Sequence, residues 1–252
     1  MSAELSATAT VEEILSKKSV IELRELARSF YVKGSSKMRK VELISEVKAA
    51  LMIPERLEEL LYVLDSAAWQ TFRKAAETSE PVQLNLTESR WYQILHGLCY
   101  LHFITGNRSL ACNVPPEIRT VYNSLVTDGL IQRKKHYDQL HLYAEAAANL
   151  YGVISQDDFV ALFNSQNEDI TSKEELFDAL IRHIVVDAGY CFWDKYIVDI
   201  GFEDNGFADV SDLLAQIGDK PRYIPEKKEF LKYADWRYFE HNEHSRNLGD
   251  YL

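Results

Sequence analysis

Apolar residues recur at helical spacing along most of this chain, and that spacing constrains the fold more than any other feature of the sequence. It is clearest in residues 20–30 and 39–51. The two apolar stripes consist of Ile21, Leu23, Leu26, Ala27 and Phe30, and of Val41, Leu43, Ile44, Val47 and Leu51. Gly34 lies between them, where a left-handed backbone would suit glycine. We therefore expect two helices joined by an extended loop, with a shared core of Leu23, Leu26, Leu43, Ile44 and Val47.

The middle of the chain predicts a second group of helices and then a hairpin. Pro54 favours a helix start, and the pattern over 66–77 predicts a further helix with Ser66 as its N-cap. That helix would turn Trp69 and Phe72 inward. A linker over 78–86 contains one short strand and leads to a helix over 88–98, whose apolar face consists of Trp91, Ile94, Leu95 and Leu98.

Residues 99–114 have the alternation of a hairpin that turns at Gly106-Asn107, and another helix opens at Pro115. Helix, helix and hairpin is close to the winged-helix order. The expected recognition helix would expose Glu88, Arg90, Gln93 and His96, and Arg108 would lie at the tip of the wing. One arginine beside one glutamate is a poor surface for reading bases. We expect a structural or protein-binding unit rather than a DNA reader.

The C-terminal half continues the helical pattern. Residues 128–151 are helical, and two helices follow over 155–167 and 172–185, capped by Ser155 and Ser172; Ser172 and Glu175 form a capping box. Residues 189–202 predict a second hairpin, and short helices finish the chain, the last over 238–252. This last pattern stops abruptly at Leu252, as in a trimmed chain.

The expected fold class is mainly α (α+β), because only ten glycines and six prolines punctuate the sequence. The expected domains are residues 1–51, a helix–extended–helix module; 52–127, a winged-helix-like region; and 128–252, an α+β region.

Charge is distributed unevenly along the chain. Residues 15–50 carry nine Lys or Arg and four Glu, a net charge of +5. The whole chain carries −11 and the first 14 residues carry −3, so residues 51–252 carry −13. Four of the cations, Lys33, Lys37, Arg39 and Lys40, lie in the segment KGSSKMRK. Positive side chains are unfavourable at a helix N-terminus unless an anion binds there, and phosphate is the usual anion.

The segment IELRELARSFYVKGSSKMRKVELISEV resembles the helix–extended–helix module at the N-terminus of transcription termination factor Rho and the related SAP domain. The matching residues are the Leu23, Leu26 and Ala27 stripe, Val32-Lys33-Gly34, Ser36-Lys37-Met38 and Glu42-Leu43-Ile44. The resemblance implies that Lys33, Lys37, Arg39 and Lys40 face nucleic-acid phosphates. Phe30-Tyr31 is bulkier than the usual pair before the loop, and related LEM-type helix pairs bind proteins instead.

The rest of the chain resembles bacterial and phage proteins that place such a module before an uncharacterised α+β body. The segments that carry this likeness are AAANLYGVIS, NSQNEDITSKEEL and YIPEKKEFLKYAD. It implies no activity. The tetrapeptide RKKH, at 133–136, is a second and weaker basic spot.

No motif predicts catalysis, a cofactor or a metal. His241 and His244 are spaced i and i+3, whereas a metal-binding helix favours i and i+4. His96 and His102 are expected to be packed or half-exposed. The three cysteines, Cys99, Cys112 and Cys191, lack metal-ligand spacing, and we expect free thiols in a reducing, cytoplasmic setting. No segment is apolar enough to span a membrane.

The function we expect is therefore non-catalytic. The basic module would contact the phosphates of DNA or RNA, and the acidic remainder would contact a protein. The alternative is a pure protein–protein module, such as a phage-encoded inhibitor with an acidic surface. An enzyme whose active site is assembled from distant residues is the third possibility. The oligomeric state is not predicted.

Overall fold

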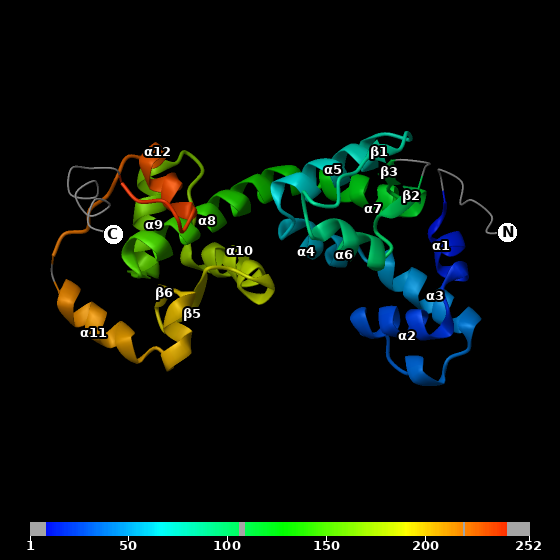
Figure 1. Ribbon diagram of the computed structural model, residues 1–252, viewed down its shortest axis with the longest axis horizontal. Helices are drawn as coiled ribbons and strands as arrows, with labels where there is room; N and C mark the ends of the chain where they lie inside the picture. The colour runs from blue at the N-terminus through cyan, green and yellow to red at the C-terminus, as the bar shows by residue number, and fades with distance from the viewer. Residues whose placement is uncertain (1–8, 106–108, 219, 241–252) are drawn as a thin grey trace. The chain divides into compact units, whose positions relative to one another are not determined.

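The computed structural model describes residues 9–105, 109–218 and 220–240 and divides into two compact units, residues 1–132 and 133–252 (Figure 1). Helix α8 (Leu130–Tyr151) begins in the first unit and continues into the second. The fold is mainly helical with two small antiparallel sheets, as the sequence predicts. The boundaries expected after residues 51 and 127 stay predictions.

The first unit contains a helix pair that confirms the predicted module. Helix α2 (Val20–Ser29) and helix α3 (Lys40–Leu51) are joined by an extended loop that contains the short 3₁₀ helix η1 (Ser35–Lys37). Gly34 has φ 76°, as expected. The core between the helices is made by Leu23, Leu26, Ala27 and Phe30 from the first segment and Leu43, Val47, Ala50 and Leu51 from the second.

Three residues of the predicted stripes lie elsewhere. Ile21 is 69% exposed and Val41 is 79% exposed, and Ile44 is only half-buried. Ile21 precedes Leu23 by two residues, and Val41 precedes Leu43 by two. Two residues correspond to about 200° around a helix, so each side chain points away from the face that its neighbour buries.

A helix that the sequence analysis did not predict precedes the pair. Helix α1 (Val11–Lys17) buries Val11, Ile14 and Leu15. It begins with a capping box in which the Thr10 hydroxyl accepts a hydrogen bond from Glu13 N, and the Glu13 carboxylate accepts one from Thr10 N. The signal in the sequence was the Thr-x-x-Glu spacing, which also starts α2 as Ser19-x-x-Glu22.

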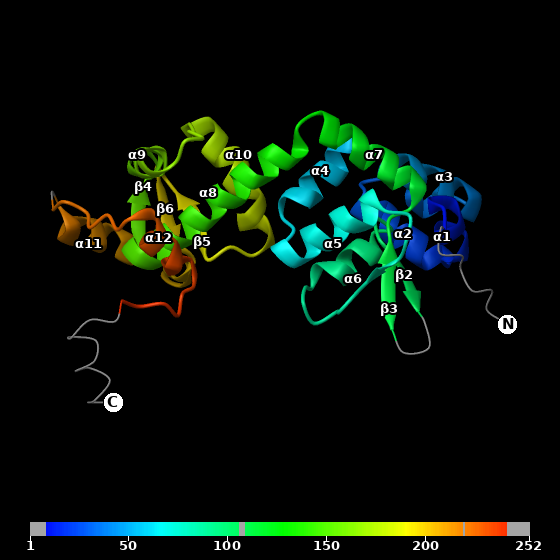
Figure 2. The same cartoon turned by 90° about the horizontal axis from the view of Figure 1, so that it is seen from above.

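The predicted winged-helix-like order is present in the rest of the first unit. Its elements are α4 (Pro54–Tyr62), α5 (Ser66–Glu77), β1 (Val82–Gln83), α6 (Trp91–Gly97), β2 (His102–Thr105), β3 (Leu110–Asn113) and α7 (Pro116–Thr127). The strands pair antiparallel in the order β1–β3–β2, with Val82 opposite Cys112 and Phe103 opposite Cys112 on its other side. Figure 2 shows β2 and β3 side by side. The predicted turn at Gly106-Asn107 lies outside the described residues, and so does Arg108.

Two local predictions in this region are wrong. The N-cap of α5 is Asp65 rather than Ser66: its Oδ1 accepts a hydrogen bond from Ala68 N at 2.9 Å, and its Oδ2 accepts one from Ser89 Oγ at 2.6 Å. Ser89 Oγ in turn accepts a hydrogen bond from Trp91 N at 3.1 Å, so Asp65 and Ser89 link the starts of α5 and α6. Ile94 is 38% exposed instead of lying in the apolar face of α6, because that short helix buries Trp91, Tyr92 and Leu95.

The second unit packs helices on a second three-stranded sheet. It contains the rest of α8, β4 (Val153–Ser155), α9 (Gln156–Gln166), α10 (Lys173–Val186), β5 (Tyr190–Trp193), β6 (Tyr196–Asp199), η2 (Ile200–Asn205), α11 (Ala208–Ile217), α12 (Lys227–Phe230) and η3 (Leu231–Ala234). The predicted hairpin is β5–β6, and the strand order is β4–β6–β5. Strand β4 was not predicted. A core that includes Tyr143, Phe159, Phe163, Tyr190 and Phe230 lies between these elements.

Capping predictions in the second unit are largely confirmed. Ser155 and Ser172 cap α9 and α10. Only half of the Ser172–Glu175 box is present, because the Glu175 carboxylate accepts a hydrogen bond from Thr171 Oγ1 at 3.1 Å. The final predicted helix is wrong over 238–240, which are not helical, and its remainder, including His241 and His244, lies outside the described residues.

The expected basic spot at RKKH is also wrong. Lys134 is 1% exposed, and its Nζ lies 2.7 Å from Asp138 Oδ1, one turn further along α8. Arg133 and His136 are half-buried, which leaves Lys135 as the exposed cation of the four. The helical spacing that buries Lys134 was not evident from the tetrapeptide alone.

Candidate nucleic-acid interface

The basic loop, residues 33–40, is built around a left-handed glycine. Gly34 turns the chain from α2 into η1, and Met38 returns it to an extended conformation before α3 (Figure 1). Lys33 and Lys37 are exposed on this loop. Ser35 is buried. The turn thus presents two lysines to solvent on a short segment whose first 3₁₀ residue is buried.

Arg39 is the N-cap residue of α3, and its side chain is 87% exposed. Its Nη2 lies 3.0 Å from Glu42 Oε1, and Glu42 Oε2 accepts a hydrogen bond from Arg39 N at 2.7 Å. The pKa of Glu42 is lowered, first by that backbone hydrogen bond and then by the Arg39 side chain. The chain's own carboxylate therefore occupies the helix end where the sequence argument placed a bound anion.

Lys40 is half-buried, and its Nζ donates a hydrogen bond to Ser16 O at 2.8 Å. Ser16 lies in the last turn of α1, where carbonyl groups lack helical partners and a cation is favourable. Lys40 thus joins α3 to α1, a role that the sequence did not reveal because α1 was not predicted.

Lys17 and Lys18 extend the positive surface beyond the residues that sequence analysis selected. They follow one another at the end of α1; Lys17 is exposed and Lys18 is half-buried. The pKa of Glu22 is lowered mainly by its capping hydrogen bonds with Ser19, and further by the charges of Lys18 and Lys40. The end of α1 and the start of α3 therefore lie close together. The available signal was the Lys17-Lys18 pair itself.

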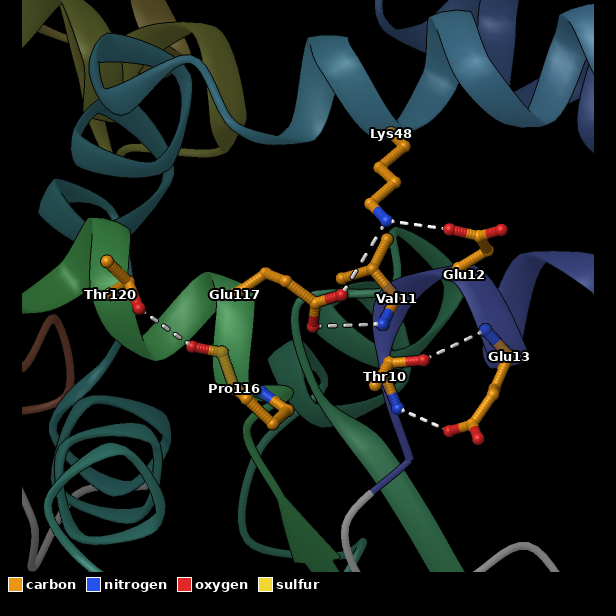
Figure 3. Close-up of polar contacts among 8 residues, drawn as sticks. All are labelled: Thr10, Val11, Glu12, Glu13, Lys48, Pro116, Glu117 and Thr120. Carbon is orange, nitrogen blue, oxygen red and sulfur yellow. Dashed lines mark hydrogen bonds and ion pairs between the residues drawn. The ribbon is translucent and has the colours of Figure 1, made fainter.

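Lys48 anchors the module to the winged-helix-like region (Figure 3). Its Nζ lies 2.8 Å from Glu12 Oε2 and 3.9 Å from Glu117 Oε1, while Glu117 Oε2 accepts a hydrogen bond from Val11 N at 3.2 Å. The pKa of Lys48 is raised, chiefly by its hydrogen bond with Glu12. Glu117 comes from the first turn of α7, so one carboxylate links α1, α3 and α7.

We expect Glu117→Ala to weaken this attachment. The substitution leaves Val11 N and one side of Lys48 without their acceptor, at a cost of about 1–3 kcal/mol in the free energy of unfolding. Hydrogen exchange should show faster exchange in the first turn of α1 while α5 and β3 keep their protection. Unchanged exchange at Val11 would contradict this role for Glu117.

A groove of about 450 Å³ lies between α2 and α6, lined by Lys18, Glu22, Glu25, Leu26, Ser29, Ile94, Gly97 and Leu98. Its two carboxylates oppose phosphate, so we do not include it in the interface. Glu88, Arg90 and Gln93 are exposed, as predicted, although α6 begins only at Trp91 and Glu88 lies in the turn before it. His96 instead stacks on Phe103 with ring centroids 4.1 Å apart.

The second unit holds a separate cluster of polar side chains. The rings of His141 in α8 and His183 in α10 stack with centroids 3.9 Å apart. His141 Nδ1 lies 2.9 Å from Tyr190 OH, and Glu145 Oε1 accepts a hydrogen bond from Gly189 N at 3.0 Å. His183 Nε2 is buried without a hydrogen-bond partner. Burial lowers the pKa of His141 to about 4 and that of His183 to about 3.

Over the residues with described positions, no three His, Cys, Asp or Glu side chains form a group that could hold a metal ion. All three cysteines are buried thiols. The helices in the described part of the chain are also too short or too polar to cross a bilayer.

Comparison with known proteins bears on one segment of the chain. Neither the curated proteins nor the solved structures contain a match. A family model does match, over a range that begins in α1, spans α2, the basic loop and α3, and ends just inside α4. Residues 15–55 form a domain of the family described as "Rho termination factor, N-terminal domain".

Proposed function

We propose that this protein binds nucleic acid through its Rho N-terminal domain and has no catalytic role. Lys33, Lys37, Arg39 and Lys40 contact the phosphate backbone, and Lys17 adds to the same positive surface. The observation that carries the proposal is the net charge of +5 on residues 15–50 of a chain that carries −11 overall. Such a concentration of cations on one small domain complements the negative charge of a phosphate backbone.

Exposure and pairing divide these cations into two groups. Lys33 and Lys37 are exposed and approach a phosphate as point charges. Arg39 is exposed, but its guanidinium forms an ion pair with Glu42. Lys40 donates one of its three ammonium hydrogens to Ser16 O. A phosphate must compete for Arg39 and can use the remaining donors of Lys40. We therefore expect Lys33 and Lys37 to contribute more to affinity than Arg39 and Lys40.

The test compares two variants of the full chain that carry the same total charge. One replaces Lys33, Lys37 and Arg39 by Gln; the other replaces Lys74, Lys195 and Lys228, which are exposed outside the domain, by Gln. Affinity for DNA and RNA oligonucleotides is measured between 50 and 300 mM salt. The loop variant should flatten the slope of log affinity against log salt by about 2 to 3 for a duplex, near 0.9 per phosphate contact, and by about 2 for a single strand.

The control variant should leave that slope within error of the unsubstituted protein. Sequence preference should not change, because phosphate contacts carry no base information. Equal slopes for the two triple variants would contradict the assignment of the basic loop. Absence of measurable binding by the unsubstituted protein, at 50 mM salt, would contradict the proposed function as a whole.

The second candidate function is binding of a protein partner by the acidic remainder of the chain. The net charge of −13 on residues 51–252 favours a partner with a basic surface. A pull-down with and without nuclease separates the two. Partners lost on nuclease treatment support nucleic-acid binding, and partners retained through it support the protein interaction.

A further inference from the structure

Tyr31 adopts a conformation that its residue type disfavours. It follows the C-cap residue Phe30 of α2 and has φ 54°. Tyr31 N donates to Arg28 O at 2.9 Å, and Val32 N donates to Ala27 O at 2.8 Å. This is the Schellman arrangement, in which the left-handed position is usually glycine because any Cβ is unfavourable there.

Packing does not account for a tyrosine at this position. The Tyr31 side chain is 87% exposed, and no hydrogen bond, ion pair or ring contact joins it to another described residue. The adjacent Phe30 shows the contrast. Its ring is 6% exposed and meets Tyr100 edge to face at 6.1 Å. Of the unusual aromatic pair before the loop, one ring therefore belongs to the core and the other belongs to the surface.

The other strained aromatic residue in the described chain has a structural reason. Phe207 has φ 65°, but its ring is half-buried and stacks on Trp193 with centroids 6.0 Å apart. A residue held in an unfavourable conformation without a packing contact indicates a functional constraint.

The surroundings of Tyr31 are positively charged. Lys33 lies two residues further along, so its Cα is within about 7 Å, and Arg28 is exposed in the last turn of α2. The loop then continues to Lys37 and Arg39. An exposed aromatic ring among cations is the chemistry by which proteins bind single-stranded nucleic acid: bases stack on the ring and phosphates lie against the cations. The bases of a duplex are already stacked on one another and cannot use such a ring.

We propose that Tyr31 stacks on an unpaired base and gives the domain a preference for single-stranded nucleic acid. This inference rests on the proposed function, because the cations of the basic loop must bring the strand to the ring. Tyr31 supplies the aromatic face and the loop supplies the charge. The left-handed backbone, fixed by two hydrogen bonds, holds the side chain at the point where the loop leaves α2.

The test uses the full chain and three variants, Tyr31→Gly, Tyr31→Phe and Trp236→Ala. Trp236 is the control, since it is 78% exposed but lies in the second unit. The probes are a mixed-sequence 12-nucleotide single strand, as DNA and as RNA, and the corresponding 12-base-pair duplex. Tyr31→Gly should weaken binding of the single strand by about 5- to 150-fold, the range expected for one lost stacking contact. It should change duplex affinity by less than about twofold, with an unchanged salt slope.

Tyr31→Phe keeps an aromatic face and should retain most of the single-strand affinity, and Trp236→Ala should match the unsubstituted protein. The melting temperature of Tyr31→Gly should not fall, because glycine suits the left-handed position. Weakened binding therefore cannot be ascribed to unfolding.

The binding measurements separate the role of Tyr31 from the proposed function of the domain. Single-strand affinity that survives Tyr31→Gly, or an equal loss on single strand and duplex, overturns the role of Tyr31 while the salt slopes still test the basic loop. No binding of any probe by the unsubstituted protein overturns both. If Tyr31→Gly instead releases a protein partner and leaves oligonucleotide binding intact, the exposed ring serves protein recognition and the inference is wrong.

Discussion

Acidification from pH 7.5 to pH 5 is expected to destabilise the second unit through His141 and His183. Both imidazoles are neutral in the folded protein, with pKa values lowered to about 4 and about 3. Burial is the main cause for both, and the charge of Lys134 disfavours protonation further. His183 is also affected by His141 and Arg182. In the unfolded chain each histidine titrates near pH 6.5.

The direction follows from proton linkage. Below pH 6.5 the unfolded chain binds protons that the folded protein does not, so folding stability is full above pH 6.5 and falls as the pH is lowered toward the folded pKa values. The loss approaches about 1.4 kcal/mol per pH unit for each histidine, or about 2 kcal/mol each by pH 5. Glu145 Oε1 lies 3.9 Å from His141 Nε2 and offsets part of this cost once His141 is protonated.

Hydrogen exchange of the α10 amides at pH 7.5 and pH 5, corrected for intrinsic rates, measures this loss. The variant His141→Gln/His183→Gln should show a smaller change in protection between the two pH values, because glutamine does not titrate. His96→Gln, in the first unit, is the control and should behave like the unsubstituted protein in α10. An α10 protection that is equal at both pH values would refute the prediction.

The second large effect is expected from Leu43→Ala in the Rho N-terminal domain. Leu43 is fully buried between α2 and α3. Removing its buried methyl groups should cost about 2–5 kcal/mol in the free energy of unfolding. A helix pair of this size has only a small core of its own, so this loss should open α2 and α3 before the rest of the first unit. Nucleic-acid binding should fall although every cation is retained.

Val41→Ala is the matched control on the same helix. Val41 is 79% exposed, and its substitution should change the free energy of unfolding by less than about 0.5 kcal/mol and leave binding intact. The two variants are compared by denaturant unfolding, by hydrogen exchange of α2 and α3, and by their affinity for oligonucleotides. Equal behaviour of the two variants would show that the helix pair does not depend on the Leu43 contact.

The sequence predicted those features that a short segment determines by itself. The Leu23, Leu26 and Ala27 stripe determined α2, Gly34 determined the left-handed turn, and Ser155 and Ser172 determined two helix starts. Each depends on residues within about one helical turn of one another. Periodicity shows which face of a helix is buried. The predicted apolar faces were too wide, however, because they included Ile21 and Val41, which are exposed.

Features that depend on distant partners were missed. Strand β4 has only three residues, too few to show alternation, and it exists because Val153 pairs with Val198 in β6. The environment of Lys40 depends on Ser16 in α1, which lies 24 positions earlier in the sequence. The stacked rings of His141 and His183 come from two different helices, and the two residues are more than 40 positions apart in the sequence. No local pattern reports such contacts, because each is created only when the unit folds.

The attachment of α1 and α3 to Glu117 has a consequence for the entropy of association. A domain on a flexible linker samples many orientations, and a ligand that touches both the domain and its neighbour must suppress that freedom. Here the contacts at Val11 and Lys48 suppress it during folding. A protein partner that contacts both the domain and the winged-helix-like region therefore meets two surfaces whose relative orientation is already set, and the orientational cost of engaging both is removed from the binding step.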